Sequence, residues 1–150
     1  VLAQHNLNAA ITCVDWAGVL EVAKRLADKW RILKQVSFRA EDLTTMDYGD
    51  SEFDAVLLGQ ITYHLSIDQN KSILKKVYRA LKEGGLVVIH APIVDEERCN
   101  SEGLILAVVI FALFGEKGNF YTFSEFKAML EEVGFSEITR HSESLISARK

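Results

Sequence analysis

Two kinds of hydrophobic pattern alternate along the chain. Compact apolar runs are typical of buried strands, whereas apolar residues that recur every three or four positions are typical of amphipathic helices. The expected strands cover residues 11–14, 36–38, 54–58, 86–89, 136–141 and 144–148. The expected helices cover residues 17–30, a segment that begins at Ser66, residues 103–114 and a segment that begins at Thr122.

Short polar motifs predict where helices begin and end. A Ser or Thr followed three residues later by Gln or Glu forms a capping box at a helix start. The two such pairs are Ser66 with Gln69 and Thr122 with Glu125. Glycine often ends a helix in the left-handed conformation, so Glu83-Gly84-Gly85 and Gly134 are the expected ends. Within the polar loop 44–52, Met46 and Tyr48 are expected to turn inward.

The order of these elements predicts an α/β fold. Alternating strands and helices indicate a mostly parallel, Rossmann-like sheet with helices on both faces. The last two strands are joined by a link too short for a parallel crossover, so the C-terminal strand is expected to be antiparallel. Most nicotinamide-binding Rossmann domains lack such a closing hairpin.

Composition narrows the class of protein. The 150 residues are 49% apolar and 25% charged, which is typical of a soluble globular domain. The net charge of −4, with both signs interspersed, predicts neither a nucleic-acid surface nor a membrane surface. The apolar segment 103–114 is shorter than the roughly 20 residues that span a bilayer. Cys13 and Cys99 lack metal-ligand spacing and favour a reducing, cytoplasmic environment.

Asp15 is the leading candidate for ligand binding. It follows a buried strand, where a carboxylate at the carboxyl edge of a parallel sheet can accept both ribose hydroxyls of a nucleoside. Asp15 could instead cap the helix that begins near Ala17. On this residue alone, a nicotinamide dinucleotide fits as well as any other nucleoside cofactor.

Several motifs in order carry a resemblance to a known family. They are Asp15, Ala40-Glu41-Asp42-Leu43, residues 53–58, Tyr63-His64-Leu65-Ser66, Leu81-Lys82-Glu83-Gly84-Gly85, residues 86–89, Tyr121-Thr122-Phe123-Ser124-Glu125-Phe126 and Gly134-Phe135. This order resembles the class I S-adenosylmethionine-dependent methyltransferases, and most of all their small-molecule O-methyltransferase branch. The similarity covers nearly the whole chain.

The resemblance implies a cofactor site for S-adenosylmethionine. Asp15 would accept the ribose hydroxyls, and Trp16 would lie against the adenine face. Asp42, with Glu41 as the alternative, would accept the adenine amino group, and the Leu43 amide would meet a ring nitrogen. Gly59 and Gln60 would follow a strand that ends beside the cofactor. The alternatives are a partly buried aromatic side chain at Trp16, a solvated acidic turn at Glu41 and Asp42, and ordinary loop polarity at Gly59 and Gln60.

His64 is the candidate catalytic base. In the branch that this chain resembles, a histidine in this loop removes the proton from the acceptor hydroxyl, a role that suits a side chain titrating near pH 6.5. Leu65-Ser66 replaces the acid–aromatic pair that follows this histidine in the branch, which leaves a structural role open. His90 could face the substrate. Glu96 or Glu97 could orient a base, although solvation at the surface is the favoured explanation for that acidic run.

One element of the resemblance is missing. The glycine-rich turn after the family's first strand would precede Val1, so residues 1–150 are expected to be the C-terminal part of a catalytic domain. The neighbours of that first strand would then present unpaired edges. The N-terminal helical region of the branch would also lie upstream, and a homodimer is expected in the full-length protein.

The expected function is methyl transfer to a small molecule, with a hydroxyl oxygen as the expected acceptor. N- or C-methylation would differ only in the acceptor pocket. The alternatives are a nicotinamide-dependent oxidoreductase and a non-catalytic methyltransferase-like fragment that acts in assembly. A nucleic-acid methyltransferase is disfavoured, because the only proline, Pro92, follows an alanine and no Asp/Asn-Pro-Pro-aromatic motif is present.

Overall fold

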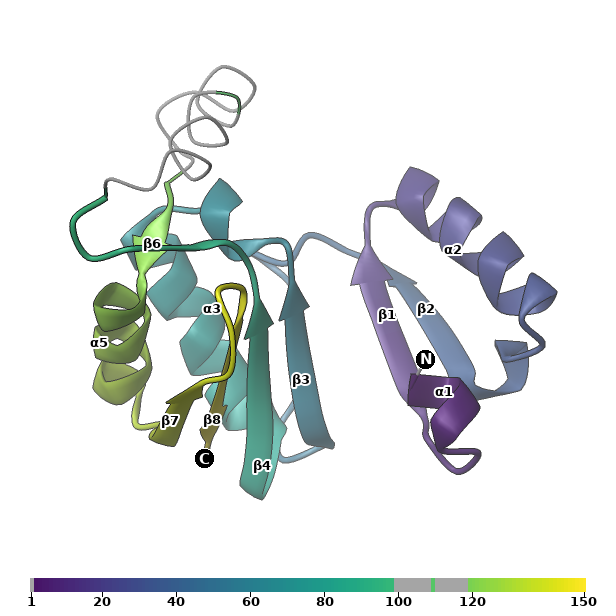
Figure 1. Ribbon diagram of the computed structural model, residues 1–150. Helices are drawn as coiled ribbons and strands as arrows, with labels where there is room; N and C mark the ends of the chain where they lie inside the picture. The colour runs from purple at the N-terminus through teal and green to yellow at the C-terminus, as the bar shows by residue number, and fades with distance from the viewer. Residues whose placement is uncertain (1, 99–108, 110–118) are drawn as a thin grey trace. The chain divides into compact units, whose positions relative to one another are not determined.

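The computed structural model describes residues 2–98, 109 and 119–150 (Figure 1). They form two compact units, residues 1–46 and 47–150. The helix expected over residues 103–114 lies outside the described residues, apart from Val109. Among the helices in the described part of the chain, none is both long and apolar enough to cross a membrane.

The first unit is a parallel strand pair with one long helix. Its elements are α1 (Leu2–His5), β1 (Ile11–Asp15), α2 (Ala17–Lys29), the 3₁₀ turn η1 (Leu33–Gln35) and β2 (Val36–Ala40). β1 and β2 run parallel, in a register that begins at Ile11 opposite Val36 and ends at Asp15 opposite Ala40. Both strands were predicted, and each extends one or two residues beyond its predicted end.

The second unit contains the remaining elements. They are β3 (Phe53–Gly59), η2 (Thr62–His64), α3 (Ile67–Ala80), β4 (Leu81–His90), β5 (Ile93–Val94), β6 (Tyr121–Thr122), α5 (Phe123–Val133), β7 (Ser136–Arg140) and β8 (Leu145–Arg149). Four strands form one sheet in the order β3-β4-β8-β7, and β5 pairs with β6. β3 and β4 are parallel, whereas β8 is antiparallel to both β4 and β7. The predicted reversal of the C-terminal strand is therefore confirmed, with β8 inserted between β4 and β7.

The core of the second unit lies between this sheet and the helices α3 and α5, which pack side by side (Figure 1). Alternate residues of β4 and β8 are buried in matched pairs. Val87 lies opposite Ala148 and Ile89 lies opposite Ile146, and each of the four is at most 1% exposed. The helices contribute their predicted apolar stripes, made up of Ile73, Leu74, Val77, Phe126, Met129 and Leu130.

Most of the predicted helix boundaries are confirmed. Both capping boxes form, since Ser66 and Thr122 each accept a hydrogen bond from the backbone N–H three residues later, and the reciprocal bond is present. Gly134 ends α5 with φ +111°, in the left-handed conformation that favours glycine. Met46 and Tyr48 are buried, as predicted for their loop.

The predicted end of α3 at Glu83-Gly84-Gly85 is wrong. The helix ends at Ala80, and β4 begins at once with the fully buried Leu81. The register of β3 against β4 jumps from Phe53–Leu81 to Ala55–Leu86, so the chain bulges between these pairs. Gly84 has φ +72°, and a Cβ on Gly85 would lie 2.7 Å from the Lys82 carbonyl oxygen. The glycines therefore serve a β-bulge and not a helix cap.

β1 and β3 are among the strands that have a partner on one edge only within the described residues. β1 pairs with β2, and β3 pairs with β4. β1, predicted to be buried, is half-buried along its length, and Leu57 of β3 is 58% exposed.

Candidate functional site

The carboxyl edge of the first unit carries the acidic residues predicted from the sequence. Asp15 is the last residue of β1 and lies opposite Ala40, the last residue of β2. Because the two strands are parallel and end together, Asp15 and residues 41–43 follow the same sheet edge. The sheet thus brings together the two acidic strand ends that lie far apart in the sequence.

The Asp15 carboxylate is half-buried, and its Oδ1 accepts a hydrogen bond from the Trp16 N–H at 2.7 Å. Trp16 occupies the N-cap position of α2, and no side chain caps that helix. The alternative role of Asp15 as the helix cap is therefore not observed. Trp16 itself is 67% exposed, so its ring surface is open to a planar ligand.

The turn after β2 holds its two carboxylates through local bonds. Glu41 forms an ion pair with Arg39 at 2.8 Å. Asp42 Oδ1 accepts hydrogen bonds from the backbone N–H and the hydroxyl of Thr44, both at 2.7 Å. This Asx-type turn orients residues 42–44. Leu43, between them, is half-buried.

The carboxyl edge of the second unit carries the other predicted residues. Gly59, the last residue of β3, lies opposite His90, the last residue of β4. Gln60 follows with φ +57°, an uncommon conformation for a residue other than glycine. Its backbone N–H donates to the His90 carbonyl oxygen at 2.7 Å, and its Nε2 lies 3.3 Å from His90 Nδ1.

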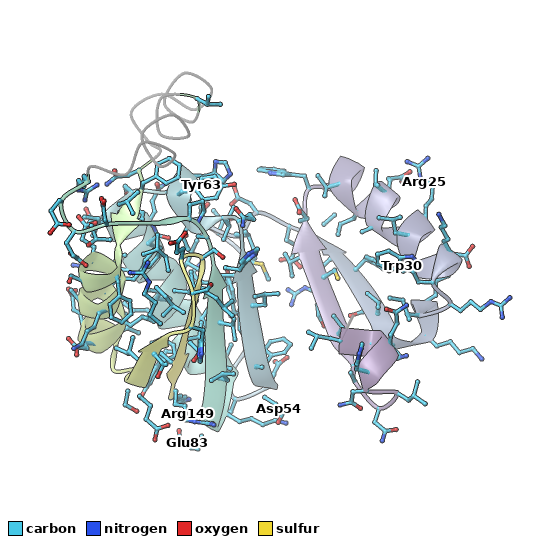
Figure 2. The ribbon with its side chains drawn as sticks, in the orientation of Figure 1. Arg25, Trp30, Asp54, Tyr63, Glu83 and Arg149 are labelled. Carbon is cyan, nitrogen blue, oxygen red and sulfur yellow. The ribbon has the colours of Figure 1, made fainter. Side chains whose placement is uncertain are left out.

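His64 lies in the turn that follows. Its ring is 4.2 Å from the Tyr63 ring, and the Tyr63 ring stacks on Phe120 with centroids 5.8 Å apart. The Asn119 N–H also donates to the Tyr63 carbonyl oxygen at 2.9 Å. Figure 2 shows Tyr63 at the end of the sheet where β3 and β4 finish, opposite the end that carries Asp54 and Glu83.

Partial burial lowers the pKa of His64 below its ordinary value, because desolvation penalises the imidazolium form. At neutral pH the ring is therefore mainly neutral, which is the form that can accept a proton. The cause of this shift in the pKa of His64 is its burial in the turn.

Two buried residues, Asn70 and Tyr121, hold the turn that carries His64. The sequence analysis assigned neither of them a role in the site. The Asn70 Nδ2 donates to the carbonyl oxygens of Thr62 and Leu65 at 2.9 Å and 3.3 Å. The Tyr121 hydroxyl donates to the Leu65 oxygen at 2.5 Å. A signal was present for Asn70, because it takes the first position of the otherwise apolar stripe that continues at Ile73 and Leu74.

Glu96 is engaged elsewhere. Its carboxylate accepts hydrogen bonds from the Ser124 N–H at 3.1 Å and the Ser124 hydroxyl at 3.0 Å. These bonds, the backbone one above all, hold the pKa of Glu96 below its ordinary value. Glu96 thus stabilises the start of α5, and no contact among the described residues supports its suggested role of orienting a base.

The side chains of Asp15 and Trp16 suit a nucleoside cofactor. The half-buried carboxylate of Asp15 only accepts hydrogen bonds, which matches vicinal hydroxyl donors, and the exposed ring of Trp16 offers an aromatic face. Within the described residues, no group of three or more His, Cys, Asp or Glu side chains is placed to bind a metal ion.

A protein-family match separates the methyltransferase hypothesis from the nicotinamide-dependent one. The family model described as a methyltransferase domain matches residues 1–89. The chain belongs to this methyltransferase family. The match supports the methyltransferase reading and not the nicotinamide-dependent one.

Individual relatives agree with this assignment. The chain is 34% identical over 88 residues to a 3-hydroxy-5-methyl-1-naphthoate 3-O-methyltransferase of Streptomyces sahachiroi, a match that covers 59% of this chain and 25% of that protein. It is 25% identical over 134 residues to an L-tyrosine C(3)-methyltransferase of Streptomyces lavendulae, covering 82% of this chain and 35% of that one.

Solved structures share the fold. A candidate O-methyltransferase of Nostoc punctiforme matches 99% of this chain and 46% of its own length, with a TM-score of 0.92 and 32% identity. The human N-acetylserotonin methyltransferase in complex with S-adenosylmethionine matches 99% of this chain and 42% of its own, with a TM-score of 0.77 and 21% identity. The chain thus spans less than half the length of these proteins.

Proposed function

We propose that the protein containing this chain transfers the methyl group of S-adenosylmethionine to a hydroxyl oxygen of a small molecule. The observation that carries the proposal is the shared sheet edge of Asp15 and residues 41–43 in a chain of the methyltransferase family. The naphthoate relative, named for 3-O-methylation, supports oxygen as the acceptor atom. The C(3)-methylating relative makes carbon the competing acceptor.

The first unit would hold the nucleoside part of the cofactor. The Asp15 carboxylate would accept the two ribose hydroxyls, and the exposed Trp16 ring would cover the adenine. Asp42, in its ordered turn, would accept the adenine amino group, with Glu41 as the alternative and the Leu43 N–H facing a ring nitrogen. A protein of the same fold holds S-adenosylmethionine, so the fold can accommodate it.

The second unit would serve the methyl acceptor. Gly59 and the Gln60 backbone, at the end of β3, would border the cofactor, and a Cβ on Gly59 would meet no atom of the described residues within 4 Å. When bound, S-adenosylmethionine supplies a methyl group on a positively charged sulfur. His64, mainly neutral at neutral pH, would take the proton from the acceptor hydroxyl and raise its nucleophilicity.

Cofactor binding tests the proposal directly. In the whole protein, isothermal titration should show binding of S-adenosylhomocysteine and none of NAD. Asp15→Asn keeps the shape of the side chain but loses its charge. The binding free energy of S-adenosylhomocysteine should therefore weaken by about 1–3 kcal/mol, the cost of leaving polar groups badly paired. Glu21→Gln, on the exposed face of α2, is the control and should bind normally. Unchanged affinity in Asp15→Asn would remove Asp15 from the site.

We also propose that the protein works as a homodimer in the cytoplasm and does not act on nucleic acid or membranes. The apolar run of residues 103–114 supports a subunit contact, since a large apolar surface favours burial against a partner. The mixed surface charge, with a net value of −4, supports a small-molecule substrate. Light scattering on the whole protein tests the dimer, and a monomer at micromolar concentration contradicts it.

A further inference from the structure

A second imidazole lies at the carboxyl edge of the second unit. His90 ends β4 between two neighbours in register, Gly59 of β3 and Leu145 of β8, and its side chain is exposed. It alternates with Ile89, which is 1% exposed and faces the core, so His90 projects from the other face of the sheet.

Among the described residues of the second unit, the space on the β3 side of His90 is open. Residues opposite each other in a sheet project to the same face, and on the β3 side the residue opposite His90 is Gly59. Within the part of the chain that the structure describes, a Cβ placed on Gly59 would find no heavy atom within 4 Å. A ligand group can therefore lie next to the His90 ring.

Gln60 reaches this ring from a backbone turn that few side chains tolerate. With φ +57°, Gln60 lies in the left-handed region, and its N–H donates to the His90 carbonyl oxygen at 2.7 Å. The turn brings the Gln60 Nε2 to 3.3 Å from His90 Nδ1. One residue thus contacts both the backbone and the ring of His90.

This contact, with the Gln60 amide oriented as it is here, favours one tautomer of His90. With the amide nitrogen of Gln60 toward the ring, Nδ1 is the acceptor and the ring proton lies on Nε2, because an amide nitrogen only donates hydrogen bonds. A carboxylate in the place of the amide would only accept, and would draw the proton to Nδ1. The side chain at position 60 therefore controls whether Nε2 of His90 carries a proton and donates a hydrogen bond, or has no proton and accepts one.

We infer that His90 contacts the methyl acceptor, donating its Nε2–H to an oxygen that flanks the reacting hydroxyl, and that Gln60 is the positioning residue that sets this tautomer. The inference rests on the proposed function and names its acceptor class, a hydroxyl with a neighbouring carbonyl, carboxylate or second hydroxyl. His64 keeps the separate task of accepting the proton, so the two imidazoles divide donation and acceptance between them.

The tautomer is measured without any substrate. In the whole protein labelled with ¹⁵N, the ring nitrogen shifts of His90, assigned by their loss in His90→Gln, should show the proton on Nε2. Gln60→Glu has the same length but no donor, and should move the proton to Nδ1. Gln60→Asn is the matched control, because asparagine tolerates the left-handed backbone. Its side chain is one methylene shorter than glutamine and carries no carboxylate, so Nδ1 of His90 should not gain the proton. Unchanged ring shifts in Gln60→Glu would overturn the role of Gln60.

The acceptor contact is measured with S-adenosylhomocysteine present. Adding 3-hydroxy-2-naphthoate, whose carboxylate flanks its hydroxyl, should shift the His90 ring signals, and 2-naphthol, which lacks the carboxylate, should not. With S-adenosylmethionine instead, His90→Gln should raise KM for 3-hydroxy-2-naphthoate about fivefold to tenfold, the worth of one neutral hydrogen bond. The control His5→Gln, in the first unit, should leave KM unchanged. If no shift follows addition of 3-hydroxy-2-naphthoate, His90 does not contact this acceptor class.

Failure of this inference is distinguishable from failure of the proposed function. If the wild-type protein does not bind S-adenosylhomocysteine, the proposed methyl transfer is wrong. The tautomer of His90 is measured without the cofactor, so that result is independent. Normal cofactor binding together with unmoved His90 signals would overturn only the assignment of His90.

Discussion

Replacing Asn70 tests whether the buried amide holds the turn that carries His64. Asn70 is 2% exposed, and its Nδ2 donates to the carbonyl oxygens of Thr62 and Leu65. Neither carbonyl would be left wholly unpaired without it, since Thr62 O also accepts from the Leu65 N–H at 3.3 Å and Leu65 O accepts from the Tyr121 hydroxyl. The loss in Asn70→Leu is thus that of two hydrogen bonds, one of them long, or about 2 kcal/mol in the free energy of unfolding.

Asn70→Asp should be the more damaging change. It has the same shape, but its carboxylate would face two carbonyl oxygens in a buried position, so an unpaired charge adds to the lost bonds. A decrease of about 3–5 kcal/mol is expected. Urea unfolding of the whole protein, followed by far-ultraviolet circular dichroism, compares the variants at an unchanged denaturant slope. Ser72→Ala, on the exposed side of α3, is the control and should change stability by less than about 0.5 kcal/mol.

Two results would refute this reasoning. One is an Asn70→Leu protein within about 0.5 kcal/mol of wild type, which would mean that the bonds to Thr62 and Leu65 contribute nothing net. The other is an Asn70→Asp protein that is no less stable than Asn70→Leu. If the turn does position a base, both variants should also lower kcat with S-adenosylmethionine more than they raise KM for the acceptor.

Further predictions follow from single features of the two units. His64→Gln should lower turnover by more than tenfold if His64 is the base, because general-base catalysis contributes about 10²–10⁴-fold; a smaller decrease in initial rates would exclude that role. The pKa of His64 is lowered in the folded state, so the unfolded chain binds its proton first as the pH decreases, and stability should decrease from about pH 6.5 downward, the ordinary histidine pKa. Urea titrations should show this pH slope in wild type and a shallower one in His64→Gln. Gly85→Ala should destabilise the protein by about 1–3 kcal/mol, because its Cβ would lie 2.7 Å from the Lys82 carbonyl oxygen; an unchanged melting temperature would contradict the bulge. Residues 1–150 produced alone should show no cooperative melt above about 45 °C, a typical mesophilic value, because β1 and β3 each present an unpaired edge within the described residues.

Much of the fold could be predicted because its signals are local. The apolar runs of β1, β2 and β3 and the two capping boxes depend on residues within a few positions of each other, and all were confirmed. The methyltransferase family was also predicted from the order of the strand ends, and the family match confirms it. The cofactor residues predicted from that resemblance, Asp15 and Asp42 among them, remain predictions.

Other features were out of reach because they depend on contacts between distant residues. Gly84 and Gly85 follow an amphipathic stripe, which is the local signature of a helix end, yet pairing with β3 places them in a bulge. The hydrogen bond between Gln60 and His90 joins residues 30 positions apart and arises only because β3 and β4 end together.

The sequence alone determined the periodicity of each element, the helix caps and the acidic strand end at Asp15, because these follow from side-chain chemistry within one or two turns of chain. The tertiary structure decided which strand ends meet. Parallel pairing brought the end of β2 beside Asp15 and His90 beside Gln60, and the packing of Asn70 and Tyr121 fixed the His64 turn. The physical reason is that a hydrogen bond has a reach of about 3 Å, so the partner of a buried polar group is set by the fold and not by distance along the chain.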